Sequence, residues 1–132
     1  MNISIPVGAK GQAAASVDEH RTASAMGSGS VPTFATPAMI VLMEQAAVNA
    51  IQRYLEEGQD SVGTLVNVTH RAPTPIGRRV RAEAEVTAVE GSRITFNVRA
   101  YDWIELIGDG THQRVVVDRE QFLWKAATKG KT

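Results

Sequence analysis

The chain has 132 residues, of which 43% are apolar and 21% charged, as expected for one soluble domain with an ordinary core. Lys and Arg (14) balance Asp and Glu (14), so no basic field favours nucleic acid or a membrane surface. Cys is absent, which excludes disulfides, thiolate zinc sites and cysteine nucleophiles. No apolar run approaches the ~20 residues of a membrane span. Residues 1–12 lack the pattern of a secretory signal, so we expect a cytoplasmic protein.

The first 35 residues are weakly patterned. A short strand is expected around Ala13–Val17. Ser24–Ser30 is rich in small and flexible residues, which favours a mobile, lid-like loop rather than a linker between domains. We therefore expect one domain over residues 1–132.

A long helix is predicted over residues 36–57. Thr36 precedes Pro37, which places a hydroxyl at the expected N-cap and proline at the first helical position. Gly58 supplies the stop. At about 20 residues the helix would run ~30 Å, the width of a small domain. Apolar side chains recur along it at helical spacing: Met39, Ile40, Met43, Ala47, Ala50, Ile51, Tyr54 and Leu55.

After Gly58 the pattern alternates, which predicts antiparallel strands between residues 61 and 124. The first strand ends at His70 and is broken by the prolines of Ala72–Gly77. The last is expected over Glu105–Val117, with two glycines marking a bulge or a close backbone approach. The faces expected to be apolar are those of Val62, Thr64, Val66, Val68 and His70, of Val80, Ala82, Ala84, Val86 and Ala88, and of Ile94, Phe96, Val98 and Ala100.

The order of elements is a strand, a long helix and four antiparallel strands in a meander. One helix with a broad apolar face, packed on one curved antiparallel sheet, is the simplest arrangement that buries both. The sequence therefore predicts an α+β protein with the hotdog fold, in which a curved sheet wraps one central helix.

Glu44 lies just inside the edge of the apolar arc of the predicted helix. A carboxylate there is costly unless it is paired. It is either an edge glutamate whose stem bends to solvent, or a carboxylate held in a part-apolar cleft as nucleophile or general base.

His70 and Thr36 are the other candidates. His70 ends an apolar strand beside an irregular loop, where sites tend to lie, although a structural histidine is the commoner case. Thr36 has an ordinary explanation as a helix cap. Eight residues of helix separate Thr36 from Glu44, about 12 Å by helical rise. A shared site would therefore need substrate, His70 or a second subunit to span the gap.

His112 and Arg114 lie two residues apart and share one face of the last strand, as an anion-contacting pair or a solvated polar face. The three histidines have no metal-ligand spacing, and neither phosphate-binding loops nor a nucleophile elbow occur as motifs.

Two runs of the sequence resemble a known family. The run from Phe34 to Glu44 (FATPAMIVLME), followed by that from Gly63 to His70 (GTLVNVTH), is similar to hotdog-fold thioesterases of the fluoroacetyl-CoA thioesterase type. The proline break at 72–77 and the segment IGDGTHQR at 107–114 also match in order and spacing. The resemblance spans roughly residues 33–122.

The resemblance implies a catalytic group of Thr36, Glu44 and His70. It also implies substrate contacts at Gly63, Thr64 and Arg114, with Gly63 at the reacting carbonyl and Arg114 near the thioester. It implies a homodimer that binds acyl-CoA at the subunit interface. The exposed groups on the polar strand faces leave a tetramer as the alternative assembly. The family uses no metal or redox cofactor.

The sequence departs from the family before Thr36, where fluoroacetyl-CoA thioesterase carries bulky apolar residues that form a lid. Here Val17–Val31 is short and dominated by Ala, Ser and Gly. The resemblance therefore implies the type of reaction but not the identity of the acyl group. The expected function is hydrolysis of a short or medium acyl-CoA thioester. The alternatives are a non-catalytic acyl-CoA or acyl-carrier binding module, and a hydratase or dehydratase on the same fold.

Overall fold

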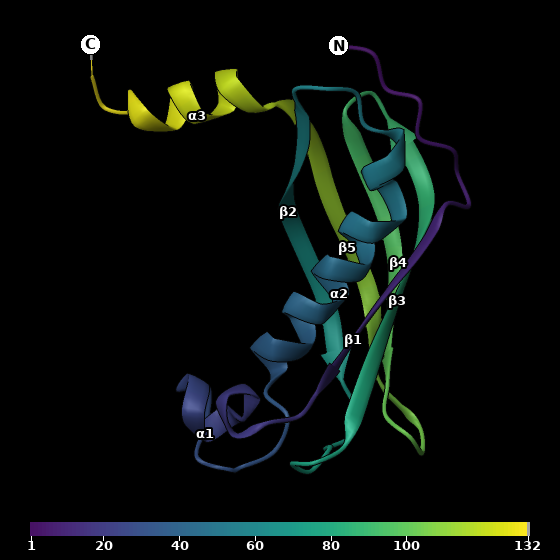
Figure 1. Ribbon diagram of the computed structural model, residues 1–132, viewed down its shortest axis with the longest axis vertical. Helices are drawn as coiled ribbons and strands as arrows, with labels where there is room; N and C mark the ends of the chain where they lie inside the picture. The colour runs from purple at the N-terminus through teal and green to yellow at the C-terminus, as the bar shows by residue number, and fades with distance from the viewer. Residues whose placement is uncertain (132) are drawn as a thin grey trace.

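The computed structural model describes residues 1–131, in which a five-stranded antiparallel sheet curls around one long helix (Figure 1). This is the helix-and-sheet arrangement expected from the sequence. In chain order the elements are β1 (Lys10–Ser16), the short 3-10 helix η1 (Glu19–Arg21), α1 (Ala23–Met26), α2 (Thr36–Ile51), the 3-10 helix η2 (Gln52–Tyr54), β2 (Gln59–His70), β3 (Arg79–Glu90), β4 (Arg93–Tyr101), β5 (Leu106–Asp118) and α3 (Arg119–Ala127).

The strands lie in the order β1-β3-β4-β5-β2. Only β3, β4 and β5 form a meander, so the expectation that all four later strands follow one another is wrong. β2 pairs with β5 and becomes an edge of the sheet. The reason is the connection over residues 71–78, which is too long and too proline-rich to act as a hairpin turn and instead carries the chain to β3.

Helix α2 lies in the hollow of the sheet and ends earlier than expected, at Ile51, where the chain tightens into η2. Gly11 of β1 has its α-carbon against the backbone of Ala46 and Ala50, so any side chain there would collide with α2. Glycine and alanine thus allow the helix to approach the sheet closely. Eight α2 side chains are buried: Ala38, Met39, Leu42, Met43, Ala46, Ala47, Ala50 and Ile51.

A bulge in β3 changes which side chains face the core. The register slips between Val86 and Ala88, so that Ala88 lies opposite Thr95 and Val89 lies opposite the buried Ile94. Val89 packs against the core, and the expectation that Ala88 does so is wrong. The extra residue of a bulge reverses the alternation of the strand beyond it.

Two terminal regions also differ from expectation. β1 begins at Lys10, earlier than expected, and part of the segment expected as a loop forms the single helical turn α1, capped by Thr22 and Gly27. Residues 119–124, expected within the strand region, belong to helix α3. The Asp118 side chain accepts from the backbone N–H of Gln121 and so starts this helix. Within residues 1–131, no helix is long and apolar enough to cross a membrane.

Candidate active site

Thr36 and His70 meet where α2 begins and β2 ends. Thr36 is the first residue of α2, but the N-cap is Ala35 and no side chain caps this end, which corrects the expected capping role of Thr36. Its hydroxyl instead shares a hydrogen bond of 2.8 Å with Nδ1 of His70. The proline that follows fixes the first turn of the helix and therefore the position of this hydroxyl.

The imidazole of His70 is half-buried, with the Phe34 ring edge-on to it at a centroid distance of 6.3 Å. Its Nε2 is buried and has no hydrogen-bond partner among the described residues. Burial lowers the pKa of His70, and the polar backbone of Ala72 offsets this only in part. The neutral imidazole, able to accept a proton, is therefore favoured near neutral pH.

Thr36 and His70 both line a cavity of about 320 Å³. The remainder of its wall comes from the segment before α2 and from the loop after β2: Ala23, Ser28, Gly29, Val31, Thr33, Phe34, Arg71, Ala72 and Pro73. Apart from Val31 and Phe34, the first of these segments contributes only small side chains. One side of the cavity is thus formed by the lid-like segment expected from the sequence, with little apolar bulk.

A bulge in β2 decides which of its side chains face α2. The register slips between Gly63 and Leu65, which leaves Thr64 as the extra residue. Gly63 lies opposite Arg114 and Val66 opposite His112, so the inward face changes from odd to even positions at the bulge. The expectation that Val62 and Thr64 share a face with His70 is therefore wrong.

Glu44 forms a second polar group, at the middle of β2. Nη1 of Arg114 donates to Oε2 of Glu44 at 3.1 Å, while its Nε donates to the hydroxyl of Ser61 at 2.9 Å. The side chain of Glu44 is 37% exposed and that of Arg114 is 8% exposed. A Cβ on Gly63 would come within 2.5 Å of the same Glu44 oxygen, so any other residue there would force the carboxylate out of its present position. Glu44 is thus fixed by an ion pair and keeps access to solvent.

His112 supports this group through its contact with Arg114. Its Nδ1 lies 2.8 Å from the carbonyl oxygen of Leu65, and its Nε2 lies 3.2 Å from Nη1 of Arg114. A carbonyl only accepts, so Nδ1 carries the proton and Nε2 accepts from Arg114. Burial lowers the pKa of His112, the Leu65 carbonyl opposes this, and the ring stacks on Phe96 at 5.7 Å. His112 and Arg114 are both buried, so their face is not a solvated one.

The structure therefore places the expected site residues in two groups. Thr36 and His70 share the cavity, whereas Glu44, Gly63 and Arg114 lie together farther along α2. Thr64 belongs to neither and bonds the backbone of Gln113. Sequence reasoning missed Ser61 and gave His112 no role in holding β2. The only signal for His112 was its spacing of two from Arg114.

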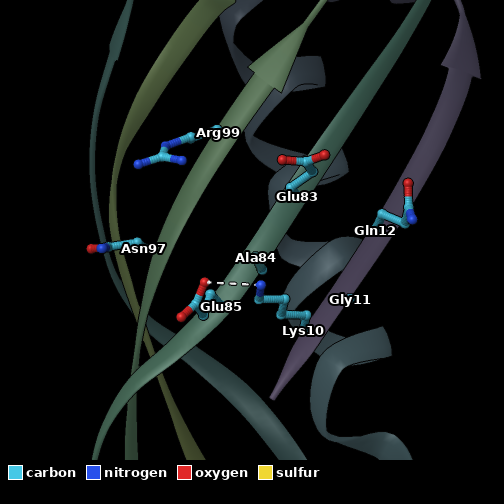
Figure 2. A pocket seen from close by; sticks show the side chains of 8 residues that line it. All are labelled: Lys10, Gly11, Gln12, Glu83, Ala84, Glu85, Asn97 and Arg99. Carbon is cyan, nitrogen blue, oxygen red and sulfur yellow. Dashed lines mark ion pairs between the residues drawn. The ribbon is translucent and has the colours of Figure 1, made fainter. Parts of the chain in front are cut away.

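A second hollow lies on the opposite face of the sheet, away from α2 (Figure 2). It measures about 420 Å³ and is lined by charged and polar side chains of β1, β3 and β4. Its ion pair, Lys10 with Glu85, spans 3.9 Å between side chains that are 75% and 51% exposed, so solvent screens it. None of the expected site residues lines this hollow. In the described part of the chain, no group of three or more His, Asp or Glu is arranged to hold a metal ion.

Comparison with solved structures defines the class of protein. A hot-dog-like protein from Thermanaerovibrio acidaminovorans superposes with a TM-score of 0.87 at 27% identity, over 97% of this chain and 95% of its own. A structure of the fluoroacetyl-CoA thioesterase FlK superposes with a TM-score of 0.88 at 38% identity, over 96% of this chain and 98% of its own. The protein has the hotdog fold, as the sequence predicted.

The family follows from sequence comparison. A fluoroacetyl-CoA thioesterase from Streptantibioticus cattleyicolor is 47% identical over 96 residues, which are 73% of this chain and 69% of the relative. The fluoroacetyl-CoA-specific thioesterase family matches residues 17–120, and the chain belongs to it. The protein is a thioesterase, which confirms the resemblance read from the two sequence runs.

Proposed function

We propose that this enzyme hydrolyses short or medium acyl-CoA thioesters to the free acid and CoA, with Thr36, Glu44 and His70 as its catalytic residues. The observation that carries this proposal is the 2.8 Å hydrogen bond between Thr36 and His70 inside a cavity open to solvent. The buried Nε2 of His70 adds to it, because a buried polar atom with no partner among the described residues calls for an explanation, and a catalytic role supplies one.

The reaction cleaves the C–S bond of the thioester and adds the elements of water. Glu44 acts either as a nucleophile on the carbonyl carbon, so that the thiolate leaves and water then hydrolyses the acyl-enzyme anhydride, or as a base that takes a proton from the attacking water. His70 then transfers a proton, to the leaving thiolate or from the water. Thr36 donates or accepts a hydrogen bond at the reacting group, and the backbone amide near Gly63 is the candidate donor to the oxyanion. The ion pair with Arg114 holds the Glu44 carboxylate in one position beside Gly63.

We propose further that two chains together complete the site. Within one chain, Glu44 bonds Arg114, while Thr36 and His70 bond each other. Helical rise separates Thr36 from Glu44 by about 12 Å. A homodimer with the edge strand β2 at its interface would place acyl-CoA between the two groups, with residues of both chains around it.

The fluoroacetyl group is one candidate among short acyl groups. The curated relative described above is a fluoroacetyl-CoA thioesterase. The cavity wall before Thr36 offers only Val31 and Phe34 as larger apolar side chains, which gives little basis for selecting a fluorinated acyl group. Acetyl-CoA and fluoroacetyl-CoA therefore belong in the same panel, together with longer chains.

The test is release of free thiol from that panel, with Glu44→Gln as the decisive variant. The amide keeps the shape of the side chain and removes its charge, so we expect a folded protein without turnover. Glu57→Gln is the matched control, because Glu57 is exposed and lies outside both polar groups. Full activity in Glu44→Gln would remove Glu44 from the mechanism. Inactivity of the parent protein on every acyl-CoA would overturn the proposed substrate class.

A further inference from the structure

Helix α3 exposes apolar side chains without covering its own chain. None of its residues is buried, and Phe122, Leu123 and Trp124 are 40%, 50% and 70% exposed. Phe122, Leu123, Ala126 and Ala127 fall within about 140° of arc at ~100° per residue. A short helix with one apolar side is marginal in water unless that side packs on something. Within residues 1–131, this side of α3 is left exposed.

The direction of α3 narrows the choice of partner. It follows β5 directly and projects past β2, away from the body of the protein (Figure 1). α1 and the loop that follows it project on the same side of the molecule, at the opposite end of β2 (Figure 1). α3 therefore leaves from one end of the edge strand, and the Thr36–His70 cavity lies at the other.

The edge strand β2, which runs between α3 and the cavity, pairs with no strand of the described chain on its outer side. β2 bonds β5 on one side only, and its five central residues, 63–67, are all exposed. Leu65 and Val66 are 42% and 40% exposed. A long edge strand with free backbone groups and apolar side chains is a template for pairing with another strand. A second copy of this chain offers the same strand, and two copies can pair antiparallel about a two-fold axis at the centre of β2.

That symmetry brings α3 of one chain to the cavity of the other. Gln59, at the start of β2, lies opposite Asp118, the residue before α3, whereas His70 is at the far end. Antiparallel pairing places the N-terminal end of one β2 beside the C-terminal end of the β2 of its partner. Neighbouring strands are about 4.8 Å apart, and nine helical residues span about 13 Å. α3 is long enough to cross its own β2 and reach the partner's.

We propose that α3 of one chain docks on a second copy of the same chain, over the mouth of its Thr36–His70 cavity. There it supplies the apolar cover that the Ala-, Ser- and Gly-rich segment before α2 does not. Val31, on the cavity wall, is 54% exposed and is the side chain that α3 would meet. The inference rests on the dimer of the proposed function and goes beyond it, because it assigns a separate part of the partner to the site.

Because the chain contains no Cys, every thiol in a cross-linking test is one that has been introduced, and each cross-link can be assigned to a known pair of positions. Chains carrying Leu123→Cys are co-expressed with differently tagged chains carrying Ser30→Cys, next to Val31, and treated with a short bis-maleimide. We expect a covalent heterodimer. Glu90→Cys replaces Ser30→Cys as the control, because Glu90 is also exposed but lies at the β3–β4 turn. A protein that is monomeric, or dimeric without the Ser30 cross-link, overturns the inference.

A kinetic experiment tests this inference separately from the proposed function. The double variant Leu123→Ser/Trp124→Ser removes apolar surface from α3, and we expect KM for acyl-CoA to rise roughly tenfold, the equivalent of ~1.4 kcal/mol. Lys125→Ser on the same helix is the control, with KM unchanged. Unchanged KM in the double variant would contradict a cover over the site. If the cross-link forms but the parent protein, without the introduced Cys residues, releases no thiol, the docking stands and the proposed function is overturned.

Discussion

Oγ1 of Thr36 lies 2.8 Å from Nδ1 of His70, although 34 residues separate the two along the chain. The start of α2 and the end of β2 bring them together, and neither residue has another hydrogen-bond partner among the described side chains. The Thr36 hydroxyl does not cap its helix and instead bonds the imidazole, and the proposed function rests on this arrangement.

Thr36→Ala should therefore lower activity far more than stability. Loss of the hydrogen bond that orients His70 should reduce kcat/KM about tenfold to a hundredfold, the effect of ~1.4 to ~2.8 kcal/mol. A lost N-cap would cost ~1 kcal/mol of stability, and we expect less, because the hydroxyl makes no cap. Thiol-release kinetics and urea unfolding measure the two effects. Thr36→Ser keeps the hydroxyl and should retain most of the activity; equal loss in both variants would contradict the role of the hydroxyl.

The elements of the fold could be predicted largely from periodicity, and the site only in part. Alternation located β2 to β5, and the hydroxyl–proline signal located the start of α2. Bulges were not predictable, because the extra residues in β2 and β3 leave the polar and apolar pattern locally intact. The place of β2 at the sheet edge depends on long-range pairing that no local pattern encodes.

The site residues could likewise be predicted from the sequence only in part. Thr36, His70 and Glu44 stood out because each placed a polar group on or beside an apolar face. Their arrangement in two groups depends on the bulge in β2, which places Gly63 opposite Arg114 and leaves space there for the Glu44 carboxylate. α3 was missed although Asp118, at its N-cap, is a common start signal.

The pH dependence of activity should report the environment of His70. Burial lowers its pKa below the ordinary 6.5, so the neutral imidazole persists into mildly acidic solution. If His70 accepts a proton in the reaction, kcat/KM should fall on the acidic side with a midpoint below 6.5. In the unfolded chain His70 has its ordinary pKa of 6.5, which is higher than its pKa in the folded chain. The unfolded chain therefore binds more protons as pH decreases below 6.5, and the free energy of unfolding should also fall. An acidic limb above pH 7 that disappears in His70→Asn would contradict the lowered pKa.

His112→Phe should weaken the Glu44 group without removing a catalytic residue. Phenylalanine retains the stacking on Phe96 but loses the bond to the Leu65 carbonyl and the acceptor for Arg114. We expect a loss of about 1–3 kcal/mol in stability from the unpaired buried groups. A lower kcat should accompany it, because Arg114 is freed to move away from Glu44.

The matched control for that variant is His20→Phe. The side chain of His20 is exposed and lies 3.7 Å from that of Glu19, so both unfolding and kcat should be unchanged. If His112→Phe lowered stability alone and left kcat and its pH profile as in the parent, His112 would be a structural histidine with no influence on Glu44.

Asp102 should stabilise the loop that supports the cavity. Its carboxylate accepts from the Thr74 hydroxyl at 2.9 Å and from the backbone N–H groups of Ile104 and Glu105. Thr74 is fully buried, and its carbonyl accepts from the N–H of Phe34 in the cavity wall. Asp102→Ala would leave the buried hydroxyl unpaired and should cost about 1–3 kcal/mol at neutral pH.

The pH dependence of that loss distinguishes a hydrogen-bonded carboxylate from a packing effect. Burial raises the pKa of Asp102, but its three hydrogen bonds outweigh burial and hold the pKa below the ordinary 3.8. The stabilisation is therefore complete above pH 3.8 and is lost as pH falls through the lower pKa of the folded state. Unfolding of the parent and of Asp102→Ala should converge in acid. Asp109→Ala, which removes an exposed ion pair with Arg71, should cost no more than ~1 kcal/mol. A difference between the parent and Asp102→Ala that stayed constant down to pH 2 would mean that the carboxylate charge contributes nothing.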